Sequence, residues 1–371
     1  MCAMHHIISD GWSLGVLLRE LGAGYAAAVE GRPSALPEPA LQYADYAAWQ
    51  RAWLNGDAAA RQLDYWKTKL GDAPVLELPA DRPRAAEPGS RGGRVAFRLS
   101  PDVFAAVRGL GARHRATPMI TLLAAFKVLL ARYTGTVDVV AGAPVAGRNR
   151  PELEELIGLF VNTLALRTDL GGDPSFGEVV DRVRDTLVEA QAHQDLPFDR
   201  VVDALRAGAD PRRNPLFEVS FTYASAPREE MRLPGLSLSG APADAGVTRL
   251  DLEMHLMEDD DGLHVALVYR SELFDETTVE RMAGHFTRLL DGALAAPDTR
   301  ISALPLLGED ERRTVVEAWN AESAAYPADR CVHQLFEAHA ARTSDAPAVV
   351  FGDEGLTYAE LNARANRLAH H

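Results

Sequence analysis

Two adjacent histidines near the N-terminus carry the clearest chemical signal in this sequence. His5 and His6 open the segment HHIISDG, residues 5–11. In an extended segment neighbouring side chains point to opposite sides, so the two rings cannot readily bind one metal ion. One imidazole can instead face a cavity, where it accepts or shares a proton, while the other packs inward. Asp10 can fix the local geometry, and Gly11 permits a turn and the close approach of a ligand.

The alternative for a lone histidine is a place in the core, where its ring nitrogens are satisfied by hydrogen bonds. In either case, helices and strands around the segment must hold the histidine in position. Apolar periodicity predicts an amphipathic helix over 13–30, with leucines on one face. Capping and periodicity signals predict further helices over 43–54, 57–70, 117–133, 175–193, 197–207 and 275–295, and one that starts at Pro101 after the cap Ser100. Strands are predicted over 94–99, 137–145, 159–170 and 216–223, and a hairpin over 249–258 and 263–271. This order predicts an α/β or α+β fold with a mixed sheet flanked by helices.

The end of the sequence is organised differently. Residues 301–330 hold prolines around one short helix and are predicted to be a linker. Residues 331–371 predict two helices around one strand. About 40 residues are too few to bury a core of their own, so we expect this piece to be the opening of a further domain.

Composition excludes several classes of function. The 371 residues carry a formal net charge of -15, which argues against a general nucleic-acid or membrane-surface binder. Hydrophobic residues make up 47% of the chain, enough for a globular core. Cys2 and Cys331 lie far apart without metal-ligand spacing, and no signal peptide precedes the histidines. We therefore expect a cytoplasmic protein without a metal site, a directly bound cofactor, or nucleic-acid or membrane partners.

The HHIISDG segment resembles the HHxxxDG signature of the condensation domains of nonribosomal peptide synthetases, in the chloramphenicol-acetyltransferase-like superfamily. Four further segments resemble motifs of that family in the same order: YADYAAWQ at 43–50, IGLFVNTLALR at 157–167, HQDLPF at 193–198 and NPLF at 214–217. LTYAELNARAN at 356–366 resembles the start of an adenylation domain. The resemblance implies a condensation domain, a linker and an adenylation domain in sequence.

The resemblance implies amide bond formation between two thioesters carried on the 4'-phosphopantetheine arms of upstream and downstream peptidyl carrier proteins. It implies that His6 is the catalytic residue, as a general base or by positioning the amine. His5, Asp10 and Gly11 are then structural. Arg148 is the expected partner of Asp10, the alternative being a solvated loop charge. Asn162 is expected in the substrate tunnel opposite His6, the alternative being a side chain that satisfies backbone groups.

The same resemblance divides the chain into a remnant of the first lobe (1–40), the second lobe (41–300), the linker (301–330) and the adenylation fragment (331–371). The first lobe is expected to be largely missing, and the donor to have the L configuration. The aromatic face of Trp49 and Trp53 is expected to serve packing. A second hypothesis is an inactive fragment that only docks a carrier protein. We also expect self-association through residues 14–25.

Overall fold

The computed structural model describes residues 4–85, 89–205, 210, 212–224, 231–238, 246–259, 262–321 and 329–371. The chain divides into two compact units, Met1–Gly308 and Glu309–His371. The boundary between the units falls inside the segment 301–330, which the sequence predicts to be a linker.

The first unit is built on a mixed sheet of six strands. The strands are β1 (Gly92–Leu99), β2 (Asp138–Val145), β3 (Asn162–Asp169), β4 (Val219–Ala224), β7 (Leu252–Asp259) and β8 (Gly262–Arg270). Their order across the sheet is β1-β8-β7-β4-β2-β3. β4 runs parallel to both of its neighbours, β2 and β7, and the other pairs are antiparallel. A two-stranded ribbon of β5 (Met231–Leu233) and β6 (Leu236–Leu238) lies outside this sheet, and the sequence patterns do not predict it.

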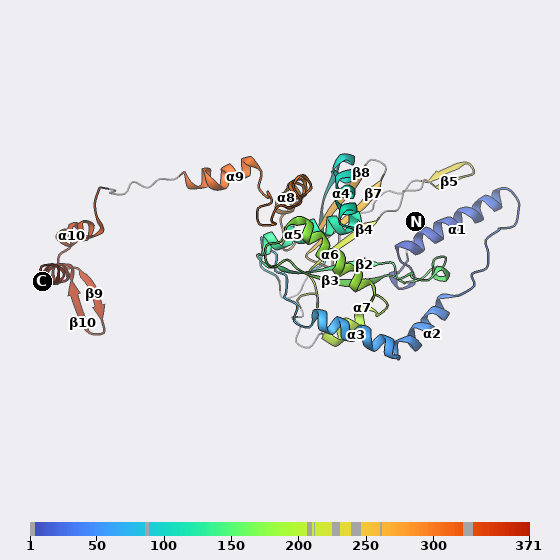
Figure 1. Cartoon of the computed structure of the whole chain (residues 1–371), viewed down its shortest axis with the longest axis horizontal. Coiled ribbons are helices and arrows are strands. Elements are labelled where there is room, and N and C mark those ends of the chain that lie inside the picture. Colours follow the sequence, from blue (N-terminus) through green and yellow to red (C-terminus); the bar gives the residue numbers. More distant parts are fainter. Residues whose placement is uncertain are drawn as a thin grey trace. The chain divides into compact units, whose positions relative to one another are not determined.

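Helices flank the sheet, as the sequence predicts. They are α1 (Gly11–Val29), α2 (Tyr43–Leu54), α3 (Asp57–Leu70), α4 (Pro101–Arg113), α5 (Pro118–Thr134), α6 (Phe176–Gln191), α7 (Phe198–Leu205) and α8 (Glu276–Ala295), with the short 3-10 helices η1 (His6–Ile8) and η2 (Pro151–Leu153). Figure 1 shows α5 and α6 on one side of β2 and β3, and α3 and α7 on the other. The sheet is therefore covered on both faces in this part of the unit.

Helix α5 forms the centre of the hydrophobic core. Every residue from Ile120 to Ala131 is buried. The side chain of Thr117 accepts a hydrogen bond from the N–H of Ile120, and a proline follows at the first helical position, so the helix starts where the sequence predicts. Burial on all sides explains why this helix reads as a continuous apolar run rather than as an amphipathic stripe.

Some element boundaries differ from those predicted. The strand expected over 159–170 begins at Asn162, because the main chain of Leu159 and Phe160 bonds to side chains outside the sheet. The strand expected over 216–223 begins at Val219. The predicted hairpin forms between β7 and β8, but its turn residues 260–261 lie outside the described residues, as does the end of the helix expected over 197–207.

The second unit contains α9 (Glu309–Val316), η3 (Ala318–Asn320), α10 (Val332–Arg342), β9 (Pro347–Phe351), β10 (Glu354–Thr357) and α11 (Tyr358–Ala369). β9 and β10 pair as an antiparallel hairpin, whereas the sequence patterns predict only the first of these strands. Among the described residues of this unit only Ala340 is buried. The unit thus has almost no core of its own.

No helix among those described is by itself long and apolar enough to cross a membrane; α4 and α5 meet the length and composition criteria only together, with a bend of 99° between them.

Candidate active site

The two histidines do not lie in the extended segment that the sequence predicts. His6 begins the 3-10 helix η1, and Nδ1 of His5 accepts a hydrogen bond from the N–H of Ile7 at 3.1 Å. His5 therefore caps a short turn, which competes locally with extended backbone. Both histidines are exposed, so the expectation that one of them packs inward is wrong. Among the described residues, neither belongs to a group of three potential metal ligands.

Asp10 is the N-cap of α1 and the main acceptor of a buried network. Its Oδ1 accepts hydrogen bonds from the N–H of Ser13 at 2.8 Å and from the hydroxyl of Ser13 at 2.7 Å. Its Oδ2 accepts a hydrogen bond from the N–H of Phe160 at 2.9 Å. With the cap at Asp10, the helix begins at Gly11, two residues earlier than predicted. One carboxylate thus joins the start of α1 to the segment that precedes β3.

Arg148 supplies the positive charge beside this carboxylate. Its Nη2 lies 3.3 Å from Oδ1 of Asp10, and the two side chains are 1% and 3% exposed, so Arg148 is buried and not a solvated loop charge. Its Nη1 donates hydrogen bonds to the carbonyl oxygens of Leu153 and Leu156. The guanidinium carbon lies 4.2 Å from the centroid of the Phe160 ring, a cation–π geometry.

The electrostatics of Asp10 follow from these contacts. Burial raises the pKa of its carboxyl group, but hydrogen bonds from Ser13 and Phe160 and the charge of Arg148 lower the pKa, and the net result is below its ordinary value. The carboxylate is therefore ionised at neutral pH and balances the buried guanidinium.

Gly11 does not play the part that the sequence suggests. It is the first residue of α1 and is exposed. A Cβ atom built on it would meet nothing within 4 Å, and its φ is not in the left-handed region. Neither a close backbone approach nor special backbone freedom is therefore seen at this glycine.

Asn162 begins β3, and its side-chain amide bonds to the main chain. Nδ2 donates hydrogen bonds to the carbonyl oxygens of Gln194 and Leu196 at 2.9 Å and 2.8 Å, and Oδ1 accepts one from the N–H of Phe198 at 2.9 Å. These three bonds hold the turn between α6 and α7. This geometry matches the second expectation for Asn162, in which its side chain satisfies hydrogen-bonding groups of the backbone.

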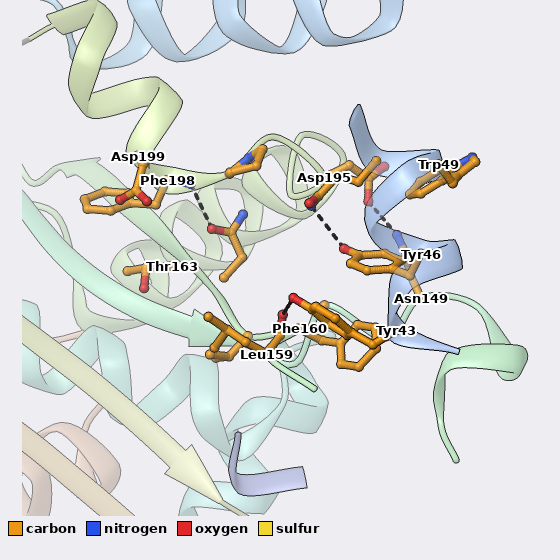
Figure 2. A pocket seen from close by; sticks show the side chains of 15 residues that line it. Tyr43, Tyr46, Trp49, Asn149, Leu159, Phe160, Thr163, Asp195, Phe198 and Asp199 are labelled. Atoms are coloured by element: carbon orange, nitrogen blue, oxygen red, sulfur yellow. Dashed lines mark hydrogen bonds between the residues drawn. The ribbon is translucent and has the colours of Figure 1, made fainter. Parts of the chain in front are cut away.

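A pocket of about 320 Å³ opens beside Asn162 (Figure 2). Figure 2 shows the aromatic side chains of α2 on one side of it and Thr163 and Phe198 on the other. His6 does not line this pocket, so the structure does not bring His6 and Asn162 together in one cavity. The lining residues come from α2 (Tyr43, Tyr46, Trp49, Gln50), from the loop before β3 and its start (Gly147, Asn149, Leu159, Phe160, Val161, Asn162, Thr163) and from the turn into α7 (Asp195, Pro197, Phe198, Asp199).

Two glycines allow the walls of this pocket to close. Gly147 has a φ of +65°, and a Cβ atom there would lie 2.0 Å from the carbonyl oxygen of Phe160. A Cβ atom at Gly158 would lie 2.1 Å from Cδ2 of Tyr43. The hydroxyl of Tyr43 in turn donates a hydrogen bond to the carbonyl oxygen of Leu159 at 2.8 Å. Any larger residue at either glycine would displace a wall.

Sequence reasoning missed the aromatic wall of the pocket. It assigned the face of Trp49 and Trp53 to packing, and Trp53 does pack against the core. Trp49, however, is 39% exposed and lines the pocket with Tyr43 and Tyr46. The available signal was the spacing of three residues between successive aromatic side chains, which places them on one helix face.

Comparisons with known proteins place the chain in a family. The family model of the condensation domain matches residues 1–316. Malpinin synthetase of Mortierella alpina is 44% identical over an aligned length of 372 residues, which covers 100% of this chain and 5% of that protein. Tyrocidine synthase 3 of Brevibacillus parabrevis is 40% identical over 368 residues, 99% of this chain and 6% of that protein. The chain thus spans less than a tenth of the length of these relatives.

Solved structures agree with this assignment. The X-domain from teicoplanin biosynthesis is 32% identical with a TM-score of 0.73, covering 82% of this chain and 71% of that one. A four-domain nonribosomal peptide synthetase bound to AMP and glycine is 25% identical with a TM-score of 0.78, covering 99% of this chain and 29% of that one. The predicted chloramphenicol-acetyltransferase-like fold with a mixed sheet is confirmed. The chain belongs to the condensation domain family of the nonribosomal peptide synthetases.

Proposed function

We propose that this chain forms an amide bond between two thioesters, each carried on the phosphopantetheine arm of a carrier protein. The observation that supports the proposal most directly is the position of His6. Its ring is open to solvent, four residues before a carboxylate that a buried ion pair holds in place. A histidine that is accessible in a fixed segment suits a role in proton transfer.

The chemistry needs only one proton to move. The α-amine of the acceptor attacks the thioester carbonyl of the donor, a C–N bond forms, and the C–S bond breaks. The amine loses a proton, and the departing thiolate gains one. His6 accepts or shares this proton, or it positions the amine for attack. Holding two tethered reactants together supplies much of the acceleration in either case.

In this proposal the other residues of the site have positioning roles. Asp10 and Arg148 join the His6 segment to the segment before β3, and neither touches the reacting atoms. Asn162 shapes one side of the substrate passage through the turn that it holds. His5 caps the turn in which His6 lies, which supports a structural role for it.

We also propose the organisation expected from the sequence. Residues 1–40 belong to the first lobe and 41–300 to the second, with a linker over 301–330 and the start of an adenylation domain over 331–371. The partners are upstream and downstream peptidyl carrier proteins, and the donor has the L configuration. These assignments rest on the motif resemblance.

The decisive experiment offers the chain two loaded carrier proteins and follows both dipeptide formation and carrier binding. Transfer of the donor to the acceptor carrier, seen by mass spectrometry of the intact carriers, is the expected result. Binding of a carrier without any transfer overturns the proposal and leaves the alternative, a fragment that only docks. An acceptor carrier whose amine is acetylated is the matched control, since it can bind but cannot attack.

A further inference from the structure

We propose that the pocket beside Asn162 binds the protonated side-chain amine of a basic aminoacyl substrate. The inference rests on the proposed function and names a substrate class for it. Its two observations are an aromatic wall and an acidic rim that face the same volume of about 320 Å³.

The aromatic wall comes from one face of α2. The ring centroid of Tyr46 lies 5.9 Å from that of Tyr43 and 5.8 Å from that of Trp49. Such faces attract cations through their quadrupoles. The guanidinium of Arg150 already lies 4.9 Å from the centroid of the Trp49 ring, although Arg150 does not line this pocket. The wall therefore has the chemistry to receive a second cation from the pocket side.

The charges of the pocket are of one sign. Asp195 and Asp199 are its only charged lining residues, and no lysine, arginine or histidine lines it. Asp195 accepts a hydrogen bond from Nδ2 of Asn149 at 2.6 Å, a neutral donor. Within the described part of the chain, neither carboxylate forms an ion pair with a basic side chain. A cation entering the pocket would thus meet two carboxylates that form no ion pair within the described residues, across an aromatic surface on which Trp49 also contacts the guanidinium of Arg150.

The walls are in place before any ligand binds. The hydroxyl of Tyr43 is bonded to the main chain of Leu159, and that of Tyr46 accepts a hydrogen bond from Nε2 of Gln50 at 3.1 Å. Burial, with smaller contributions from Tyr43 and Asp195, raises the pKa of Tyr46, so its ring stays neutral. A preorganised pocket spends little of the binding free energy on ordering its own side chains.

The volume limits the ligand to one short group. It lies at the lower end of the range of ligand pockets, which suits a single side chain and not a peptide. The ammonium is that of a basic side chain, because the acceptor α-amine must be neutral to attack the thioester and His6 does not line this pocket. An α-ammonium offers the same recognition chemistry, and binding measurements separate the two.

The test titrates the full chain with three amides near pH 7 by ligand-observed NMR. Nα-acetyl-lysinamide carries only a side-chain ammonium, norleucinamide only an α-ammonium, and Nα-acetylnorleucinamide neither. We expect Nα-acetyl-lysinamide to bind about tenfold tighter than the neutral amide. Equal affinities for all three, or tighter binding of norleucinamide alone, would overturn the inference.

Variants locate the binding. The double change Asp195→Asn and Asp199→Asn keeps the shape of the pocket and should abolish the preference for the cation, while Trp49→Leu should weaken it severalfold. Asp298→Asn, at an exposed aspartate outside the pocket, is the matched control and should leave the preference unchanged. A preference that survives the double change contradicts the assignment.

The test of cation binding and the test of the proposed function can fail independently of each other. Dipeptide formation from alanyl carriers without any preference for cations would overturn this inference alone. A preference for cations in a chain that forms no dipeptide would overturn the proposed function and leave the pocket as a binding site.

Discussion

Asp10 and Arg148, which lie 138 positions apart in the sequence, form a buried ion pair with 3.3 Å between Oδ1 and Nη2. The Nε atom of Arg148 is buried without a hydrogen-bond partner. The guanidinium therefore depends on its two terminal nitrogens, one of which faces Asp10. Asp10 also caps α1 and accepts a hydrogen bond from the main-chain N–H of Phe160. This one carboxylate therefore joins the segment that carries His6 to the segment that precedes β3.

Replacing Asp10 by asparagine should destabilise the first unit strongly. Removing one partner of a buried pair leaves the charge of Arg148 uncompensated, and such a change costs about 3–5 kcal/mol. Glu155→Gln is the matched control, because the pair of Glu155 with Arg19 also links α1 to the segment before β3 but is exposed. This control should cost less than about 1 kcal/mol. Urea unfolding measures both values, and equal costs would contradict the structural role of Asp10.

Lys127 should make stability rise with pH above neutrality. Its ammonium is fully buried, and burial lowers its pKa to about 7, against the opposing charge of Asp138. In the unfolded chain the pKa is near 10.5, so between these values the unfolded state binds more protons and raising the pH favours the folded state. Its Nζ donates hydrogen bonds to the carbonyl oxygens of Val139 and Leu166 and to the hydroxyl of Thr168.

The measurement compares the free energy of unfolding of the chain and of its Lys127→Met variant between pH 7 and 9.5. As the pH rises, the free energy of unfolding of the unmodified chain should increase relative to that of the variant by up to about 1.4 kcal/mol per pH unit. The same exchange at exposed Lys67 should give a difference that does not change with pH. A constant difference for Lys127→Met would show that the buried lysine stays charged in both states.

Gly158→Ala should distort the pocket. The new Cβ atom would lie 2.1 Å from Cδ2 of Tyr43, and overpacking of this kind costs about 1–3 kcal/mol. Gly24→Ala is the control, since a Cβ atom there meets nothing within 4 Å and alanine favours the helix by up to about 1 kcal/mol. Thermal unfolding and a crystal structure of the first variant test this. Unchanged stability with Tyr43 in place would contradict the packing described here.

The leucine stripe of α1 should make the chain self-associate. Leu14, Leu18 and Leu21 follow one helix face and are 45%, 47% and 60% exposed. Contact between two such faces removes apolar area from water. Static light scattering should show a mass that rises with concentration, and Leu18→Ser with Leu21→Ser should reduce the rise. The matched control is Val188→Ser, at another exposed apolar residue. A monomer at every concentration would refute the expectation.

Sequence reasoning succeeded where local patterns determine the structure. The alternation of β7 and β8 predicts their pairing, and Thr117 with Pro118 predicts the start of α5. It failed at η1, where the side chain of His5 caps a turn and outcompetes extended backbone. Short-range capping of this kind depends on side-chain geometry that residue types alone do not specify.

The candidate site was predicted only in part. The motif resemblance pairs Asp10 with Arg148, and the structure places them together. The pocket was not predicted, because α2 and the turn at 195–199 meet only through the tertiary fold. The three backbone bonds of Asn162 likewise depend on the position of that turn.

The rate of dipeptide formation in the His6→Ala variant tests the central claim most directly. His6 is exposed, so the variant should unfold at the same urea concentration as the unmodified chain. With two loaded carrier proteins at saturation, the rate of bond formation should fall by about 10²-fold or more, the range of general acid–base catalysis. His5→Ala provides the comparison at the neighbouring imidazole and should fall less. An unchanged rate in folded His6→Ala would contradict the account.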